Sequence, residues 1–183
     1  MDFSPLENDW LRLELLSIDH LQDLWLLVKH IDVFAFSPND LSSEEKLGQY
    51  ISLALEEHRQ GKSIPYAIYD KLKNRYVGSS RFGYMDQKNQ TLHIGWTWIS
   101  KESQGTGLNS SLKQLMISEA FNKMNMRKIV FRVDALNIRS RKAVEKLGAN
   151  LEGILKKDVY VKNNRLRDTC CYALFKEDFY QNK

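Results

Sequence analysis

The stretch "ISKESQGTGLN", Ile99 to Asn109, joins a segment typical of a strand to a segment typical of a helix. "TLHIGWTWI" before it is rich in aromatic and β-favouring residues, and "LNSSLKQLMISEAF" after it has apolar residues at helical spacing. A helix N-terminus exposes unpaired backbone N–H groups and the positive end of a dipole, and glycines let an anion come close to them. The stretch therefore predicts a phosphate-binding loop.

The segments around this loop predict one α/β unit. Before it we expect a strand at 10–16, a helix capped by Ser17, and a second helix with a capping box of Ser42 and Glu45. A meander of three antiparallel strands follows at 64–70, 75–84 and 91–99. After the loop helix we expect a buried strand at 128–134, a helix ending at Gly148, and strands at 149–161 and 167–175.

Composition narrows the class of protein. The chain has 183 residues, 43% of them hydrophobic, which is enough to bury a core as a single domain over residues 1–183. The 27 basic and 23 acidic residues are distributed throughout, without the patch that a nucleic-acid partner requires. The acidic start "MDFSPLENDW" lacks signal-peptide features, and no apolar run has membrane-spanning length. We therefore expect a cytoplasmic protein without a membrane partner.

Two familiar phosphate loops fit this glycine loop poorly. A Walker-type loop places Lys and Ser or Thr directly after its last glycine, but Leu108 and Asn109 follow Gly107 here. A dinucleotide fingerprint accepts Gly105 and Gly107, yet its third glycine falls on Ser110. That fingerprint also belongs to an opening βαβ unit, whereas this loop follows a meander.

The order of elements, together with the run from Gln104 to Asn109, resembles the GNAT superfamily of acyl-CoA-dependent N-acyltransferases. The family loop has Gln or Arg, two residues, Gly, one residue, then Gly or Ala; Gln104 and Gly107 match, while Asn109 departs at the last position. "NIRSRKAVEKLGA", 137–149, is similar to a second family segment. With "IGWTWIS" and the terminal "RDT" strand, the chain resembles the RimJ/RimL-type ribosomal-protein N-terminal acetyltransferases over 11–175.

This resemblance implies a fold and a cosubstrate. The fold is α/β (α+β): a mixed, mostly antiparallel sheet of about seven strands with a central splay, and about four helices. The cosubstrate is acetyl-CoA, and no metal is implied. Its pantetheine arm would pair with backbone groups of Trp98 and Ile99. Its pyrophosphate would rest on loop amides, those of Gln104, Gly105, Thr106, Gly107, Leu108 and Asn109.

The second family segment supplies two further site residues by resemblance. Asn137 would lie beside the pantetheine arm, although Asn at this point is equally explained as a plain helix N-cap. Ser140 would hydrogen-bond or protonate the leaving thiolate; the alternative is a bond from its hydroxyl back to the helix backbone. Some relatives carry a Tyr for this protonation, but Val144 stands at the corresponding position.

The base that deprotonates the acceptor amine is less well defined. His93 replaces a glutamate of the family, and with an ordinary pKa of about 6.5 it could accept a proton directly or through water. A single strand histidine can also be purely structural. Arg132 stands where some relatives carry a catalytic glutamate, which favours a water-mediated path. Aromatic residues of "VFAFSP", 33–38, and Tyr160 are expected to border the acceptor cleft.

The resemblance implies direct transfer of an acetyl group from acetyl-CoA to a primary amine. One acceptor is the N-terminus of a ribosomal or other protein, since an α-amino group of pKa about 8 needs a weaker base than a lysine of about 10.4. The alternatives are a small amine, a polyamine or an antibiotic, and a non-catalytic acyl-CoA-binding sensor. A homodimer is compatible with the resemblance.

Overall fold

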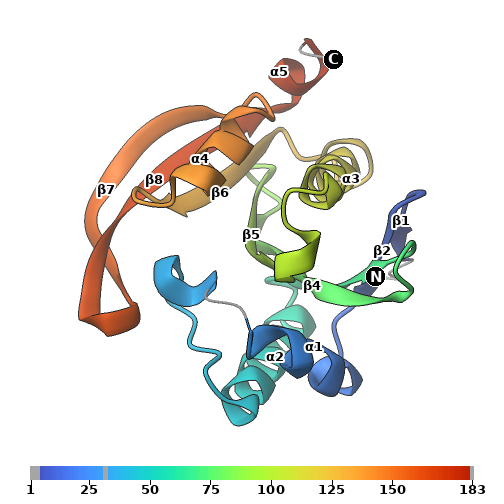
Figure 1. The fold of residues 1–183 in the computed structure, drawn as a ribbon. Helices are drawn as coiled ribbons and strands as arrows, with labels where there is room; N and C mark the ends of the chain where they lie inside the picture. Colours follow the sequence, from blue (N-terminus) through green and yellow to red (C-terminus); the bar gives the residue numbers. More distant parts are fainter. Residues whose placement is uncertain (1–4, 31–32, 182–183) are drawn as a thin grey trace.

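The computed structural model describes residues 5–30 and 33–181, and within them one eight-stranded sheet carries five α-helices (Figure 1). The strands are β1 (Leu6–Glu7), β2 (Leu11–Leu15), β3 (Ile64–Asp70), β4 (Arg75–Asp86), β5 (Thr91–Ile99), β6 (Lys128–Asp134), β7 (Asn150–Val161) and β8 (Arg165–Phe175). The α-helices are α1 (Leu21–Val28), α2 (Glu44–Arg59), α3 (Leu108–Asn122), α4 (Ile138–Glu145) and α5 (Lys176–Gln181). The predicted α/β class is confirmed, and the short β1 and α5 add to the expected elements.

The two helices after the first long strand form as predicted, but both begin later than expected, α1 after an N-cap at His20 and α2 after an N-cap at Ser43. Ser17 precedes a 3-10 turn, η1 (Ile18–His20), that leads into α1. The N-cap of α2 is Ser43, not Ser42, because the Ser43 hydroxyl accepts a hydrogen bond from the Lys46 N–H at 3.2 Å. Each helix buries one apolar face against the sheet, which an amphipathic pattern requires.

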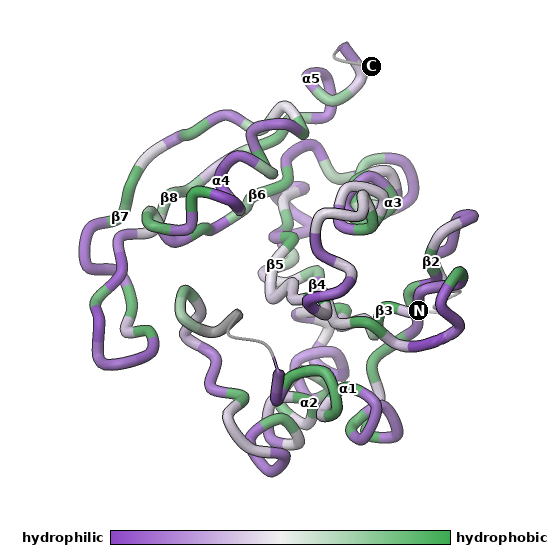
Figure 2. Tube along the Cα trace, in the orientation of Figure 1, coloured by the Kyte–Doolittle hydropathy of each residue, from purple (hydrophilic) through white to green (hydrophobic). Residues whose placement is uncertain are grey.

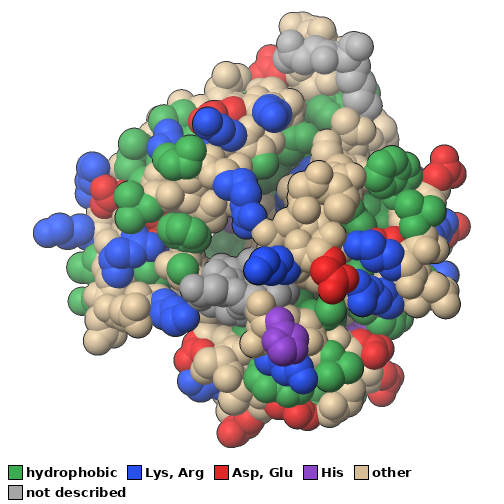
Figure 3. All heavy atoms as spheres, in the orientation of Figure 1, with side chains coloured by type: hydrophobic (Ala, Val, Ile, Leu, Met, Phe, Trp, Pro, Cys, Tyr) green, Lys and Arg blue, Asp and Glu red, His purple; other side chains and the backbone are tan. Residues whose placement is uncertain are grey.

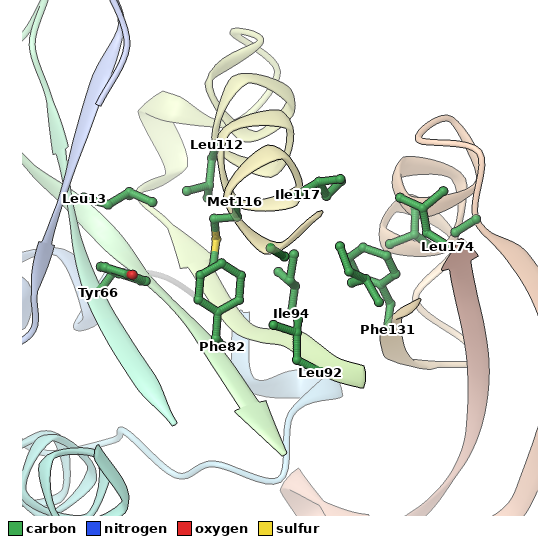
Figure 4. Packing of buried hydrophobic residues seen from close by; sticks show 14 of the residues in the cluster. Leu13, Tyr66, Phe82, Leu92, Ile94, Leu112, Met116, Ile117, Phe131 and Leu174 are labelled. Carbon is green, nitrogen blue, oxygen red and sulfur yellow. The ribbon is translucent and has the colours of Figure 1, made fainter. Parts of the chain in front are cut away.

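The sheet is covered on both sides. Leu112, Met116 and Ile117 of α3 pack onto Phe82 of β4 and Ile94 of β5 in the larger hydrophobic core (Figure 4). Helices α1 and α2 bury a second cluster that includes Trp98 on the other side. Figure 2 shows hydrophilic residues gathered instead at the far end of the β7–β8 hairpin, around the 3-10 turn η4 (Lys162–Asn164). No helix of the described residues is long and apolar enough to cross a membrane.

The two central strands, β5 and β6, position the site because they pair along only part of their length. The strand order is β1-β2-β3-β4-β5-β6-β8-β7, and the β5–β6 pair is parallel whereas the others are antiparallel. Pairing joins Thr91 to Lys128, Leu92 to Ile129 and His93 to Val130, and extends no further. Beyond His93 the strands part, which confirms the expected central splay.

A bulge in β5 accompanies this separation. The register against β4 shifts between the Ser79–Trp98 pair and the Arg81–Gly95 pair. Trp96, which lies in the bulge, has a φ of 51°, a left-handed value that a bulky residue rarely adopts. Bulges bend a strand and strengthen its twist, and they often occur next to functional sites. β5 therefore bends where its pairing with β6 has ended.

Candidate active site

A cavity of about 820 Å³ occupies the space between the parted ends of β5 and β6. Five of the residues predicted for the site line it, namely His93, Trp98, Asn109, Asn137 and Ser140. Its wall also includes parts of α2, α3, α4 and the segment after the 3-10 turn η2 (Val33–Phe36). In Figure 3 a hollow lies near the centre of the visible face, with Lys and Arg side chains at its rim.

The glycine loop lies beside this cavity and has the predicted character. Gly105 and Gly107 have φ values of 77° and 91°, which glycine adopts without the steric cost of a Cβ. Gly107 is the N-cap of α3. Within the described residues, the backbone N–H groups of Gly105, Thr106 and Gly107 have no hydrogen-bond acceptor. Three donors therefore face away from the protein's own carbonyl groups.

Two of the expected loop amides are less available. The Gln104 N–H donates to the Lys101 carbonyl at 3.2 Å, so it is less available to a pyrophosphate than the other predicted loop amides. It is used by the 3-10 turn η3 (Lys101–Ser103), which the sequence did not predict. The Leu108 N–H lies 3.4 Å from the Thr106 hydroxyl, and the Leu108 side chain belongs to the core. The free donors are therefore the N–H groups of Gly105, Thr106 and Gly107, and, within the described residues, those of Asn109 and Ser110 in the first turn of α3.

Side chains hold the loop against the rest of the site. The Thr106 hydroxyl donates to the Ser103 carbonyl at 2.9 Å. The Gln104 side-chain amide donates to the Ile99 carbonyl at 3.3 Å, and its oxygen accepts from Arg139 of α4 at 2.5 Å. Gln104 thus connects the end of β5 to the start of α4, the two elements that flank the cavity. Ile99 and residues 104–108 lie next to the cavity but do not line it.

The end of β5 offers backbone groups on one edge. Trp98 and Ile99 pair with Ser79 and Gly78 of β4, and their other edge faces the gap left by β6. The Trp98 side chain is buried in the cluster under α1 and α2, as core packing predicts. A ligand would therefore meet the backbone of these two residues rather than their side chains.

Asn137 and Ser140 lie together at the start of α4. The Asn137 side-chain oxygen accepts from the Ser140 N–H at 3.1 Å, so the N-cap role of Asn137 is confirmed. Both residues also line the cavity. Among the described residues, the Ser140 hydroxyl has no hydrogen-bond partner, and the alternative bond to the helix backbone is not formed. This hydroxyl is available to a ligand in the cavity.

His93 lines the cavity, and its surroundings disfavour the charged form of its ring. It is buried, with its ring 5.2 Å from that of Tyr84 and 6.4 Å from that of Trp96. Burial, helped by the positive charge of Arg132, lowers the pKa of His93 to about 4. The folded protein therefore lowers this pKa well below the ordinary value of about 6.5, which weakens the predicted role of His93 as a base. His93 is uncharged at neutral pH and is a weak base there.

The other end of the cavity is aromatic and carries paired charges. Phe36 of the predicted aromatic segment lines it, together with other aromatic side chains, those of Tyr50, Tyr84 and Trp96. Tyr160 is 62% exposed and does not line the cavity, although Asp158 and Val159 directly before it do. Three carboxylates of the wall form ion pairs: Glu57 with Arg81 at 2.7 Å, Asp134 with Arg165 at 2.5 Å, and Asp158 with Arg132 at 2.7 Å.

Arginines of β8 hold η2 over this end of the cavity. Arg165 donates to the Ala35 carbonyl at 3.2 Å, and Arg167 donates to the Phe36 carbonyl at 3.0 Å. These contacts join residues that are 130 and 131 positions apart in the chain. No local sequence pattern could have paired them.

Lys113 of α3 is a cavity residue that sequence reasoning missed. It is buried, and its neighbours at i+3 and i+4, Met116 and Ile117, are core residues. The signal was therefore present in the sequence, because a lysine falls on the apolar stripe of a helix that starts at the glycine loop. Lysine is almost never fully buried unless it is paired.

Comparison with known proteins places this geometry in a family. Residues 11–150 match the family described as "Acetyltransferase (GNAT) domain", and the chain belongs to that family. It is 27% identical over 172 residues to the uncharacterized N-acetyltransferase p20 of Bacillus licheniformis, covering 92% of each chain. Its fold is similar to that of RimL, described as a ribosomal L7/L12 alpha-N-protein acetyltransferase, with a TM-score of 0.84, 21% identity and 94% of each chain covered. RimL has also been solved in complex with coenzyme A, where the TM-score is 0.82.

Proposed function

We propose that this GNAT acetyltransferase transfers an acetyl group from acetyl-CoA to the α-amino group of a protein N-terminus. The observation that carries the proposal is the cavity between the parted strands, which opens beside a loop of unpaired backbone N–H groups. The coenzyme A complex of RimL, a protein of similar fold, supports the choice of cosubstrate.

The residues present fit this cosubstrate. The N–H groups of Gly105, Thr106 and Gly107 would hold the pyrophosphate at the N-terminus of α3. A Cβ built on Gly105 meets no heavy atom within 4 Å, so the space beside the loop is open. The free edges of β5 and β6 would hold the amide groups of the pantetheine arm. When bound, the cosubstrate supplies an acetyl group activated as a thioester.

Proton transfer in the site is assigned to Ser140 and to water. The Ser140 hydroxyl can donate a hydrogen bond to the sulfur of the leaving thiolate, because this hydroxyl has no hydrogen-bond partner among the described residues. His93, with a pKa of about 4, is too weak a base to take most of the proton from an amine at neutral pH. An α-amino group of pKa about 8 already loses part of its protons there. Water in the open cavity then carries the proton to solvent.

The charges of the wall favour an α-amino acceptor over a polyamine. A polyamine carries several positive charges and would need carboxylates free to receive them. The wall carboxylates Glu57, Asp134 and Asp158 are each paired with an arginine. RimL, whose fold is similar to that of this chain, is described as an acetyltransferase of the ribosomal protein L7/L12. The proposal extends that kind of acceptor to this chain.

Release of free thiol from acetyl-CoA tests the proposal. The substrates are a lysine-free peptide with a free N-terminus, a matched peptide with an acetylated N-terminus and one internal lysine, and spermidine. We expect thiol release with the first peptide and little with the other two. Release with spermidine alone would support the small-amine alternative. Binding of acetyl-CoA without release on any amine would support the sensor.

A further inference from the structure

Lys113 is a buried cationic side chain in the wall of the cavity. Only 7% of the residue is exposed. Its amino group donates a hydrogen bond to the Thr97 hydroxyl at 2.6 Å, and that hydroxyl lies 2.7 Å from the Ser80 hydroxyl. Thr97 belongs to the bulged part of β5, directly before Trp98 and Ile99. Lys113 therefore links α3 to the strand that borders the gap.

The neighbours of Lys113 supply no compensating negative charge. Thr97 of β5, Ser80 of β4 and the preceding turn of α3, with Asn109 and Ser110, are uncharged. Charged side chains on β1, β2 and β6, which pack against α3, have other partners: Glu7 with Lys71, Arg12 with Glu14, Asp134 with Arg165, and Arg132 with Asp158. His93 of β5 and Arg81 of β4 are basic side chains and supply no negative charge. Within the described residues, Lys113 forms no ion pair.

This environment disfavours the charged form of Lys113. Burial alone lowers the pKa of its amino group to about 7. In the protein without ligand, a large share of Lys113 is thus uncharged at neutral pH and most of it is uncharged above pH 8 or so. A bound anion nearby would reverse this preference, because an opposite charge stabilises the ammonium form.

The position of Lys113 in the cavity wall brings it close to the start of α3, because Asn109 and Ser110 of the first turn of that helix line the same cavity. Side chains of an α-helix point back toward its N-terminus, over the preceding turn. For Lys113 that turn contains Asn109 and Ser110, and the N-terminus of α3 at Gly107 and Leu108 lies just beyond it. This is the end of the helix where the unpaired amides make an anion site. Lys113, which has no negatively charged partner among the described residues, therefore lies close to the proposed anion site.

We propose that Lys113 is a binding residue for the phosphate groups of the cosubstrate, and that it takes up a proton when they bind. The inference rests on the proposed function, since it assumes that an acyl-CoA occupies the cavity. The proton comes from solvent, joins the Lys113 amine and forms an ammonium ion beside the phosphates. Coenzyme affinity consequently decreases as the pH rises, because binding requires a proton and the proton concentration is lower at higher pH.

Calorimetric titration with coenzyme A tests this directly. At about pH 8 the wild type is titrated in two buffers of different ionisation enthalpy, Hepes and Tris, so that the difference in heat reports protons taken up. We expect uptake of roughly half to one proton, and affinity that falls by several-fold up to about tenfold from pH 7 to pH 8. A repeat at about pH 6 should show far less uptake by the protein, because Lys113 is then already charged.

Variants assign the proton to Lys113. Lys113→Met should lose the uptake at about pH 8 and bind roughly tenfold more weakly at about pH 6. Lys113→Arg should bind without uptake, because its guanidinium remains charged throughout. Lys123→Met is the matched control at the C-cap of the same helix: Lys123 is exposed, pairs with Glu119 at 3.1 Å, and should change neither quantity. Titration of the coenzyme's own phosphate is common to all four proteins and cancels in their comparison.

The possible failures are distinguishable. Coenzyme binding by the wild type without any buffer dependence at about pH 8 would overturn the role of Lys113 while leaving the proposed function intact. Equal proton uptake by wild type and Lys113→Met would do the same. Absence of coenzyme binding by the wild type at both pH values would instead refute the proposed function. If Lys113→Met does not fold, the wild type and Lys113→Arg still give the answer.

Discussion

The two ends of the β5–β6 pair differ although they belong to the same two strands. At one end, Thr91–His93 pair with Lys128–Val130, and Leu92 and Ile129 are buried in the core beneath α3. At the other end, the strands part around the Trp96 bulge and enclose a cavity lined by polar and aromatic side chains. One end has the order of a sheet, and the other leaves backbone groups without a strand partner.

This difference shows how one sheet can provide both stability and a binding site. An unpaired strand edge is a liability for most proteins, because it invites pairing with another chain. Here the free edges border a cavity inside the fold whose wall also includes residues of α3, α4 and η2. An extended ligand with amide groups can complete the pairing that the protein leaves open. The paired end holds the two strands together and so limits how far apart their free edges lie.

The largest expected effect comes from weakening the paired end. Leu92→Ala removes a side chain that is 1% exposed, and should lower the free energy of unfolding by about 2–5 kcal/mol. Urea denaturation measures the loss. Leu72→Ala, at a site that is 78% exposed, is the control and should change stability by less than about 0.5 kcal/mol. Equal losses for the two variants would show that the paired end is not part of the stabilising core.

His93 lies where the paired end meets the parted end, and it should make stability depend on pH. Its pKa of about 4 is below the ordinary 6.5, so the unfolded chain binds more protons between these values. Stability should therefore fall as the pH drops from about 6.5 toward 4, by up to about 1.4 kcal/mol per pH unit. His93→Gln should flatten this slope in denaturation curves, whereas His30→Gln, at an exposed position, should preserve it. An unchanged slope in His93→Gln would contradict the burial argument.

At the parted end, Ser140→Ala should affect catalysis more than binding. If its hydroxyl assists the leaving thiolate, kcat should fall about ten- to a hundredfold while the Kd for coenzyme A changes little. Single-turnover kinetics and calorimetry provide the two numbers. Ser118→Ala, in α3 and outside the cavity wall, should leave both unchanged. Parallel losses of kcat and affinity in Ser140→Ala would remove the leaving-group role.

The smallest effect expected is that of one methyl group at the glycine loop. Gly105→Ala and Gly61→Ala both place a Cβ at positive φ, 77° and 69°, with no heavy atom within 4 Å. Both should lose about 1–2 kcal/mol of stability through backbone strain. Only Gly105→Ala should also weaken coenzyme binding, by about tenfold, because its Cβ enters the space beside the free amides. Similar affinities for the two variants would place the coenzyme elsewhere.

Much of the fold follows from sequence patterns. The bounds predicted for β3, β5 and β6 agree with the structure, since each is a compact run of β-favouring residues between turn signals. The short β1 and α5 carry too few residues for a periodic pattern. The Trp96 bulge was not predicted, because nothing in "IGWTWI" marks a left-handed tryptophan. It depends on the register against β4, which only the folded sheet defines.

The candidate site likewise has features that the sequence predicted and features that it could not predict. Motif resemblance located Asn137 and Ser140, and the structure brings both to the cavity. It could not give the low pKa of His93, because burial is a property of the folded chain. The contacts of Arg165 and Arg167 with η2 join distant segments and leave no trace in local sequence. Lys113 could have been found, because it interrupts the apolar stripe of α3.

Hydrogen exchange with and without coenzyme A tests the central claim most directly, because it reads both ends of β5 in one experiment. We predict that coenzyme A slows exchange in peptides covering 94–99 and 105–110, and in the parted end of β6 at 131–134. Peptides covering 91–93 and 128–130, already paired, should change little. Protection confined to other surfaces, or spread equally over both ends of β5, would contradict the claim that the parted strands and the glycine loop form the coenzyme site.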